Sequence, residues 1–164
     1  MLQFPAVSAA DLAEIAQGLD AKERVAMAEQ GVDSADFIRF LGEDSGNVAG
    51  DGNFSVQVLS EALSVWNLEV VSVTSPDAKE AKQNPLAQNA FILNLGSHWF
   101  TVRKIGGVFW NLNSLNKGGP EEIGDFYLAL LFDTLMQEGY SIFVIFGDIP
   151  EFHDRLVVKN SGLL

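Results

Sequence analysis

Cysteine is absent from the 164 residues of this sequence. That absence excludes disulfides, thiolate metal sites and a thiol nucleophile from the chain as given. Histidine is nearly as scarce, and its two copies, His98 and His153, are too few for a histidine-rich metal site. The sequence also contains neither a phosphate-binding glycine loop nor an EF-hand loop. We therefore expect no metal and no cofactor.

Basic residues are the second shortage, with 10 Lys and Arg against 22 Asp and Glu and a net charge of −12. Binding to a phosphate backbone requires clustered Lys and Arg, so nucleic acid is not an expected partner. Solubility is the simpler explanation of the acidity. If the charge serves binding, it favours a basic peptide or protein surface.

No apolar run is long enough to span a bilayer, and no basic residue precedes the short apolar stretch at the N-terminus. We therefore expect no membrane association and a cytosolic or nuclear location. An apolar content of 48% and a charged content of 20% are typical of a folded domain. The length suits one domain, which we place at residues 1–150, with a tail at 151–164.

Helical spacing dominates the first third of the sequence. Ser8 and Asp11 form a capping-box-like start, and the apolar residues that follow recur at helical spacing up to a stop at Gly31. A second short helix is expected from residue 33 or 34 to Leu41, which gives a helical hairpin. A loop rich in Gly, Asn and Asp follows over residues 42–53.

A further helix is expected from Val56 to about Trp66, with Ser55 as its cap and a buried stripe of Val56, Leu59, Leu63 and Trp66. Strand patterns then prevail, with one or two helical turns at 77–83 and a helix that Asp125 caps and Gly139 ends. The expected strands are 68–73, 90–95, 98–104, 108–113 and 140–146, and residues 114–124 are expected to form a loop. Helices followed by an antiparallel sheet predict an α+β fold.

Gly106-Gly107 is a strong signal for a two-residue hairpin. If these two residues form the loop, paired residue numbers sum to 213, so Phe100 opposes Asn113. His98 and Asn113 then lie on one face as diagonal neighbours, with β-carbons roughly 7–8 Å apart. An imidazole oriented by an asparagine oxygen is the acid–base half of a papain-like triad. The same pairing also arises by chance on many hairpins, where both residues are structural.

Several separated motifs resemble, in order, the Josephin family of papain-like cysteine deubiquitinases, of the ataxin type. The resemblance extends from about Leu2 to Pro150 and is carried by residues 19–28, 52–59 with Ala62-Leu63, 97–104, 110–114 and 138–144. It implies a papain-like fold, with an N-terminal helical hairpin followed by an antiparallel sheet with packed helices. It also implies ubiquitin and ubiquitinated proteins as partners, and residence in the nucleus and cytoplasm.

The resemblance assigns roles to five residues of this sequence. His98 and Asn113 fall on the family's catalytic histidine and asparagine. Val56, Gln57 and Trp66 fall near a ubiquitin-contacting surface, although Val56 and Trp66 fit the expected core stripe equally well. The resemblance therefore implies hydrolysis of ubiquitin conjugates through a Cys-His-Asn triad.

The sequence departs from the family in one respect. The family's nucleophilic Cys and oxyanion-stabilising Gln lie before the helical hairpin, and neither is present; residues 1–3 resemble the end of the missing catalytic helix, so Gln3 is not that Gln. We expect this chain to catalyse no hydrolysis, and to fold poorly alone or associate through an exposed apolar face. Three hypotheses follow: an incomplete record of an enzyme, a short isoform or catalytically dead module that binds ubiquitin, and an α+β interaction domain with a structural His and Asn.

Overall fold

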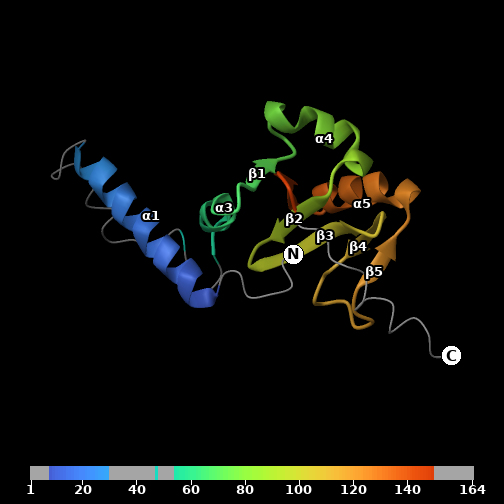
Figure 1. Ribbon diagram of the computed structural model, residues 1–164, viewed down its shortest axis with the longest axis horizontal. Helices are drawn as coiled ribbons and strands as arrows, with labels where there is room; N and C mark the ends of the chain where they lie inside the picture. Colours follow the sequence, from blue (N-terminus) through green and yellow to red (C-terminus); the bar gives the residue numbers. More distant parts are fainter. Residues whose placement is uncertain (1–7, 30–46, 48–53, 150–164) are drawn as a thin grey trace. The chain divides into compact units, whose positions relative to one another are not determined.

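A computed structural model describes residues 8–29, Asn47 and residues 54–149 (Figure 1). The chain divides into two compact units, residues 1–69 and 70–164, and each is considered by itself. The expected second helix of the hairpin lies outside the described residues, as does the loop at 42–53 except for Asn47. Within the described part of the chain, no helix is long and apolar enough to cross a membrane.

The first helix, α1 (Ala9–Glu29), begins with a reciprocal cap. The backbone N–H of Asp11 donates to Ser8 Oγ over 3.2 Å, and the backbone N–H and hydroxyl of Ser8 each donate to Asp11 Oδ2 over 2.7 Å. These bonds satisfy amide groups that the helix itself leaves without partners. The predicted capping box is thus confirmed, with Asp in the position where Glu is commoner.

Asn47 connects α1 to the start of the next described helix, α3 (Val56–Ser64). Its side-chain Nδ2 donates to Asp20 Oδ1 over 2.8 Å, and its Oδ1 accepts from the Ser55 hydroxyl over 2.9 Å. Asn47 itself is buried and its two partners are partly buried, so both bonds are partly shielded from solvent. Ser55 Oγ in turn accepts from the Val58 N–H over 3.3 Å, which confirms Ser55 as the N-cap.

The buried stripe of α3 differs from the expected one. Its fully buried residues are Val58, Ala62 and Leu63, whereas Val56, Leu59 and Trp66 are only half-buried. The small side chain of Ala62 gives a weak apolar signal, although it marks the buried face together with Val58 four residues earlier. The helix also ends before Trp66, because Asn67 adopts a left-handed conformation (φ 55°) and donates to Ser64 O.

A six-stranded sheet follows, in the order β1-β6-β2-β3-β4-β5, and neighbouring strands from β6 to β5 are antiparallel. The strands are β1 (Glu69–Ser72), β2 (Ala90–Leu95), β3 (His98–Ile105), β4 (Val108–Asn111), β5 (Glu121–Ile123) and β6 (Ser141–Phe146). Between β1 and β2 lie three short helical segments: η1 (Pro76–Ala78), α4 (Lys79–Gln83) and η2 (Pro85–Ala87).

Strand β5 corrects the expectation of a loop throughout residues 114–124. Only Ile123 of its three residues is buried, where it pairs with Phe109 of β4. The two glutamates before it are exposed. A three-residue edge strand with one apolar side chain shows no alternation of apolar and polar residues, so the strand could not be predicted from its sequence.

The register of the β3–β4 hairpin is the predicted one. Ile105 pairs with Val108, and Val102 pairs with Asn111, so paired numbers sum to 213. Gly106 and Gly107 both have positive φ, at 60° and 83°. Two successive positive φ values are the requirement of the type I′ turn, which matches the twist of the flanking strands.

The core lies on one face of this sheet, beneath α5 (Asp125–Gln137). Leu128 and Phe132 of the helix belong to the same buried cluster as Phe91 of β2, and the Phe91 and Phe132 rings meet edge-on with centroids 4.6 Å apart. Strand alternation puts Phe91 and Phe100 on this face, and also His98 at the start of β3. The sheet thus carries the core and His98 on the same side.

The N-terminus of α5 differs from the predicted one, and its C-terminus is the predicted one. Gly124 occupies the N-cap without a side-chain bond, and Asp125, expected as the cap, is the first helical residue. At the other end Gly139 (φ 95°) donates to Met136 O over 3.1 Å, and Tyr140 donates to Leu135 O over 2.9 Å. This pair of bonds is the Schellman motif, which ends the helix at the predicted glycine.

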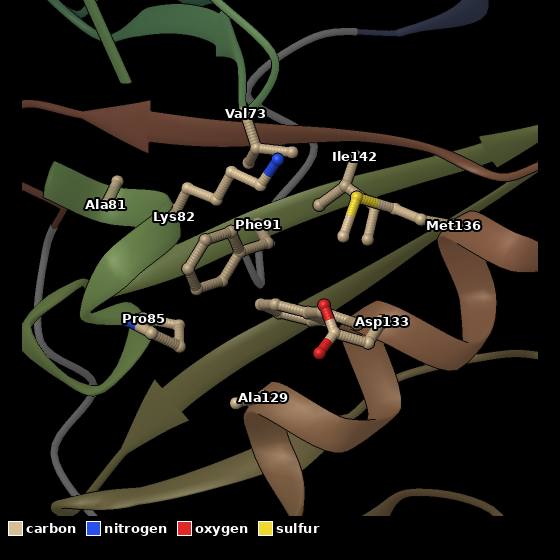
Figure 2. Close-up of a pocket in the computed structure, with 10 residues that line it drawn as sticks. Val73, Ala81, Lys82, Pro85, Phe91, Ala129, Asp133, Met136 and Ile142 are labelled. Atoms are coloured by element: carbon tan, nitrogen blue, oxygen red, sulfur yellow. The ribbon is translucent and has the colours of Figure 1, made fainter. Parts of the chain in front are cut away.

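A small apolar cavity of about 90 Å³ lies within the second unit (Figure 2). Its lining comes from α4, α5 and strands β2 and β6, and includes Phe91, Met136 and Ile142, with Lys82 and Asp133 as its charged members. None of the five residues expected to form a functional site lines it. We therefore treat it as a packing feature of the α4–α5 side of the sheet.

Gly139→Ala is expected to destabilise the second unit by about 1–2 kcal/mol, because an L side chain disfavours the left-handed backbone that this position requires. The matched control is Gly118→Ala, where φ is not in the positive range and a β-carbon meets open space. Urea unfolding of both variants checks this. Equal stabilities for the two would show that the turn after α5 does not depend on a positive φ.

The Asp11 carboxyl in the cap of α1 is expected to titrate at low pH. Hydrogen bonds from the Ser8 hydroxyl and backbone hold the pKa of the exposed Asp11 carboxyl below 3.8. Because the folded pKa is the lower one, the contribution of the cap is present above pH 3.8 and is lost as the pH falls through the folded value.

Carbon NMR of the Asp11 carboxyl measures this directly. Ser8→Ala should move the titration midpoint up toward 3.8, whereas Ser64→Ala should leave it unchanged, because that hydroxyl donates to Glu61 O. A midpoint that does not respond to Ser8 would contradict the capping box.

Candidate functional site

The β2–β3 hairpin fixes the main chain of His98. His98 is the first residue of β3 and pairs with Leu95 across a turn in which Gly96 has φ 57°. The Asn94 side chain spans this turn, and its Nδ2 donates to Gly96 O over 2.9 Å and to His98 O over 3.1 Å. One asparagine therefore holds both sides of the tight turn from which His98 emerges.

Asn113 follows β4 by two residues, and its main chain is also held by a neighbouring side chain. Leu112 N–H donates to Thr101 O over 2.8 Å, which keeps the segment beside β3 for one residue beyond the strand. Asn113 N–H then donates to Asn111 Oδ1 over 3.1 Å. A side-chain oxygen that accepts from the N–H two residues later forms an Asx turn, which mimics a backbone turn.

The two hairpins bring the predicted pair together: His98 Nε2 lies 2.9 Å from Asn113 Oδ1. The same oxygen accepts the backbone N–H of Leu115 over 3.0 Å. That backbone donor identifies this amide atom as the oxygen, because an NH₂ group could not accept it. The two lone pairs of the oxygen are thereby both used, one by the backbone and one by the imidazole.

This arrangement selects one tautomer of the neutral His98 ring. Because Asn113 Oδ1 can only accept, Nε2 carries the proton, and Nδ1 is left with a free lone pair. A ring held in this way can take a proton at Nδ1 and return it, while Nε2–H stays on the asparagine. That is the role of the histidine in a Cys-His-Asn triad.

Aromatic packing restrains the ring further. The imidazole stacks beside Phe100, with centroids 5.8 Å apart and 23° between the planes, and Phe100 in turn meets Tyr140 edge-on at 5.8 Å. Phe100 belongs to the buried core, whereas His98 is half-buried. The histidine thus rests on the core and keeps part of its surface open to solvent, as a proton-transferring group requires.

Arg103 lies further along β3 but takes no part in this site. Strand alternation places it on the face opposite His98. Its side chain is buried, and burial lowers the pKa of its guanidinium. No thiol faces His98, because the 164 residues contain no cysteine.

The three residues expected to contact ubiquitin belong to the first compact unit. Gln57 is exposed, and Val56 and Trp66 are half-buried. The expectation that Val56 and Trp66 are core residues is therefore wrong, since the buried positions are Val58, Ala62 and Leu63. His153, Gln3 and the acidic residues of the 42–53 loop lie outside the described residues.

The sequence-based reading missed the asparagines that hold the pair, Asn94 and Asn111. Asn111 accepts from the N–H two residues later, which is the spacing of an Asx turn, whereas Asn94 donates from Nδ2 to the carbonyls of Gly96 and His98. The alternation Asn111-Leu112-Asn113 could have indicated two such turns in succession. Among the described residues, no group of three or more His, Asp or Glu side chains gathers as a metal site would require.

Fold and site together define the class: an α+β protein that carries a His–Asn pair suited to proton transfer. Residues 1–146 match the Josephin family. The chain therefore belongs to this family, whose members are deubiquitinases. The predicted family membership is confirmed.

Relatives from animals and plants show the same relationship. The chain is 49% identical to Ataxin-3 of Homo sapiens over 151 residues, which cover 92% of this chain and 42% of that protein. It is 43% identical to the Ataxin-3-like protein of Homo sapiens, again with 92% and 42% coverage. It is 42% identical to the Ataxin-3 homolog of Arabidopsis thaliana over 153 residues, with 92% and 54% coverage. The chain thus spans about half the length, or less, of these relatives.

Asn113→Ala is expected to remove the preference of the neutral His98 ring for the tautomer with its proton on Nε2. Without the Oδ1 acceptor, both neutral forms become accessible, and the nitrogen chemical shifts of Nδ1 and Nε2 should move toward each other in a long-range ¹H–¹⁵N spectrum. Asn116→Ala is the matched control, because that side chain donates to Glu121 and not to the ring. A wild-type ring that already shows two averaged nitrogen signals would contradict the fixed tautomer.

Proposed function

We propose that this sequence provides the histidine and asparagine of a papain-like cysteine protease that hydrolyses ubiquitin conjugates. His98 is the general acid and base, and Asn113 orients it. The observation that carries the proposal is the 2.9 Å contact between His98 Nε2 and Asn113 Oδ1, with that oxygen oriented by Leu115 N–H. Membership of the Josephin family supports ubiquitin as the substrate class.

The chemistry follows from the free Nδ1. A thiol that approaches His98 on this side loses its proton to Nδ1, and the thiolate attacks the carbonyl of the ubiquitin C-terminus. The imidazolium then protonates the departing amine, and a water activated by the same ring hydrolyses the thioester. Because these 164 residues contain no cysteine, we expect no turnover by this chain alone.

We further propose that Val56, Gln57 and Trp66 contact ubiquitin. Val56 and Gln57 open α3, and Trp66 follows its end. Val56 and Trp66 are partly exposed apolar side chains and Gln57 is an exposed amide, and this combination suits a mixed apolar and polar partner. Ubiquitin and ubiquitinated proteins are the partners we propose, and we place the protein in the nucleus and cytoplasm, as the family implies.

A second candidate function is a catalytically dead ubiquitin-binding module or short isoform. The absence of cysteine favours it. In both cases we propose that residues 1–150 form the Josephin domain and residues 151–164 a tail. The two functions differ in whether the protein in the cell carries a reactive thiol.

A ubiquitin probe with a thiol-reactive C-terminal group distinguishes them. Added to cell extract, it should form an adduct with a protein that includes this sequence and is heavier than 17.8 kDa, as read by intact mass. His98→Ala in that protein should abolish the labelling. A 17.8 kDa form that is the only species present, and that remains unlabelled, would exclude the enzyme and leave the binding module.

Binding is expected to depend on α3 in either case. Gln57→Ala should weaken the affinity of the chain for ¹⁵N-labelled ubiquitin by about 3- to 10-fold, and Trp66→Ala by about 10-fold or more, in an NMR titration. Gln83→Ala is the matched control, since Gln83 is also an exposed glutamine in a helix, α4. Equal affinities for the Gln57 and Gln83 variants would contradict the proposed surface.

A further inference from the structure

We propose that Asn111 is a positioning residue for the acid–base pair, acting on His98 through Asn113. This inference rests on the proposed function for its catalytic consequence, whereas its structural consequence can be tested without it. Asn111 is the last residue of β4, and its side-chain oxygen contacts the backbone of Asn113 and not the imidazole. Its effect would therefore pass through the geometry of Asn113.

Two consecutive Asx turns carry the argument. Asn111 Oδ1 accepts from Asn113 N–H over 3.1 Å, and Asn113 Oδ1 accepts from Leu115 N–H over 3.0 Å. The first turn fixes the main chain of Asn113, and the second fixes its side-chain amide. The second turn leaves one lone pair on Oδ1, and this is the one that meets His98 Nε2.

Asn113 needs this support because the sheet does not provide it. The β3–β4 pairing ends at Val102 and Asn111, and the Leu112 N–H bond to Thr101 O is the last backbone bond between the two segments. The N–H of Asn113 goes to the Asn111 side chain instead. Without that acceptor the residue would be joined to β3 only through its neighbour and through the His98 contact.

The half-buried side chain of Asn111 is well placed for this role. Strand alternation puts it on the face that carries Val102 and His98, and its cross-strand partner on β5 is Glu121. In the other hairpin a second asparagine, Asn94, donates to the carbonyl of His98. Of these two contacts, only that of Asn111 holds Asn113, the residue whose amide orients the imidazole.

The test compares a variant that loses the side-chain oxygen of Asn111 with one that keeps it. Asn111→Ala removes it, and Asn111→Asp keeps an oxygen at the same place. Because the new carboxylate would face Glu121 directly, the Asp variant is made together with Glu121→Gln, which keeps an acceptor for Asn116. Glu121→Gln alone and Asn116→Ala are the controls, and amide spectra of each variant establish that it is folded.

The first readout is the His98 tautomer in this chain, from long-range ¹H–¹⁵N spectra. Asn111→Ala should move the Nδ1 and Nε2 shifts toward each other, and the Asn111→Asp, Glu121→Gln double variant should restore the separation. Unchanged nitrogen shifts in a folded Asn111→Ala variant would overturn the positioning role. If Asn111→Ala does not fold, the double variant is compared with Glu121→Gln alone. The positioning role would be overturned if the Nδ1 and Nε2 shifts were averaged in the double variant but separated in Glu121→Gln.

The second readout is hydrolysis of a ubiquitin C-terminal amide by the full-length protein that carries this sequence. Asn111→Ala should lower kcat by about 10- to 100-fold with little change in KM, and the double variant should recover most of it. Activity that is insensitive to Asn111 would overturn the catalytic part of the inference. A wild-type protein without activity, but with the expected tautomer response, would overturn the proposed function and leave the positioning role standing.

Discussion

The register of the β3–β4 hairpin is the constraint on which the candidate site depends. Gly106 and Gly107 take positive φ values, and the two-residue turn that they form sets a pairing in which residue numbers sum to 213. A slip of one residue would send His98 and Asn113 to opposite faces of the sheet. The glycine pair therefore determines, from some distance, whether an imidazole and an amide can meet at all.

Register brings the two residues near each other, and short polar side chains then set their orientation. Asn94 and Asn111 each complete a turn at the end of a strand, and Asn113 does so while it also accepts from His98. The first unit uses the same device, where Ser8 and Asp11 cap α1 and Asn47 joins α1 to the cap of α3. In both units, side chains at element ends satisfy backbone groups that regular structure leaves free.

Much of this could be predicted from the sequence, for physical reasons that differ between elements. The β2 strand was expected at 90–95 and runs from Ala90 to Leu95, because its apolar run is flanked by clear breakers. The meeting of His98 and Asn113 followed from the turn type alone. By contrast, β5 has one apolar side chain, and Gly124 caps α5 although Asp125 has the better capping side chain. Local preference could not foresee β5, because the strand forms through its pairing with β4, and it favoured Asp125 over Gly124 by one position.

The sequence does not predict how individual side-chain groups are oriented. Spacing placed His98 and Asn113 on one face, but only atomic positions show that Leu115 N–H fixes the amide and so assigns the proton to Nε2. Likewise, the apolar spacing of α3 suggested a stripe through Val56 and Trp66, whereas the small Ala62 marks the buried face.

We propose that His98 Nδ1 is the base that takes the proton of a thiol in a ubiquitin-specific protease. The most direct test is a crystal structure of the full-length protein joined covalently to ubiquitin through a thiol-reactive C-terminal group. Our account predicts that the linked sulfur lies within hydrogen-bonding distance of His98 Nδ1, with Nε2 still on Asn113. A sulfur remote from His98, or facing Nε2, would contradict it.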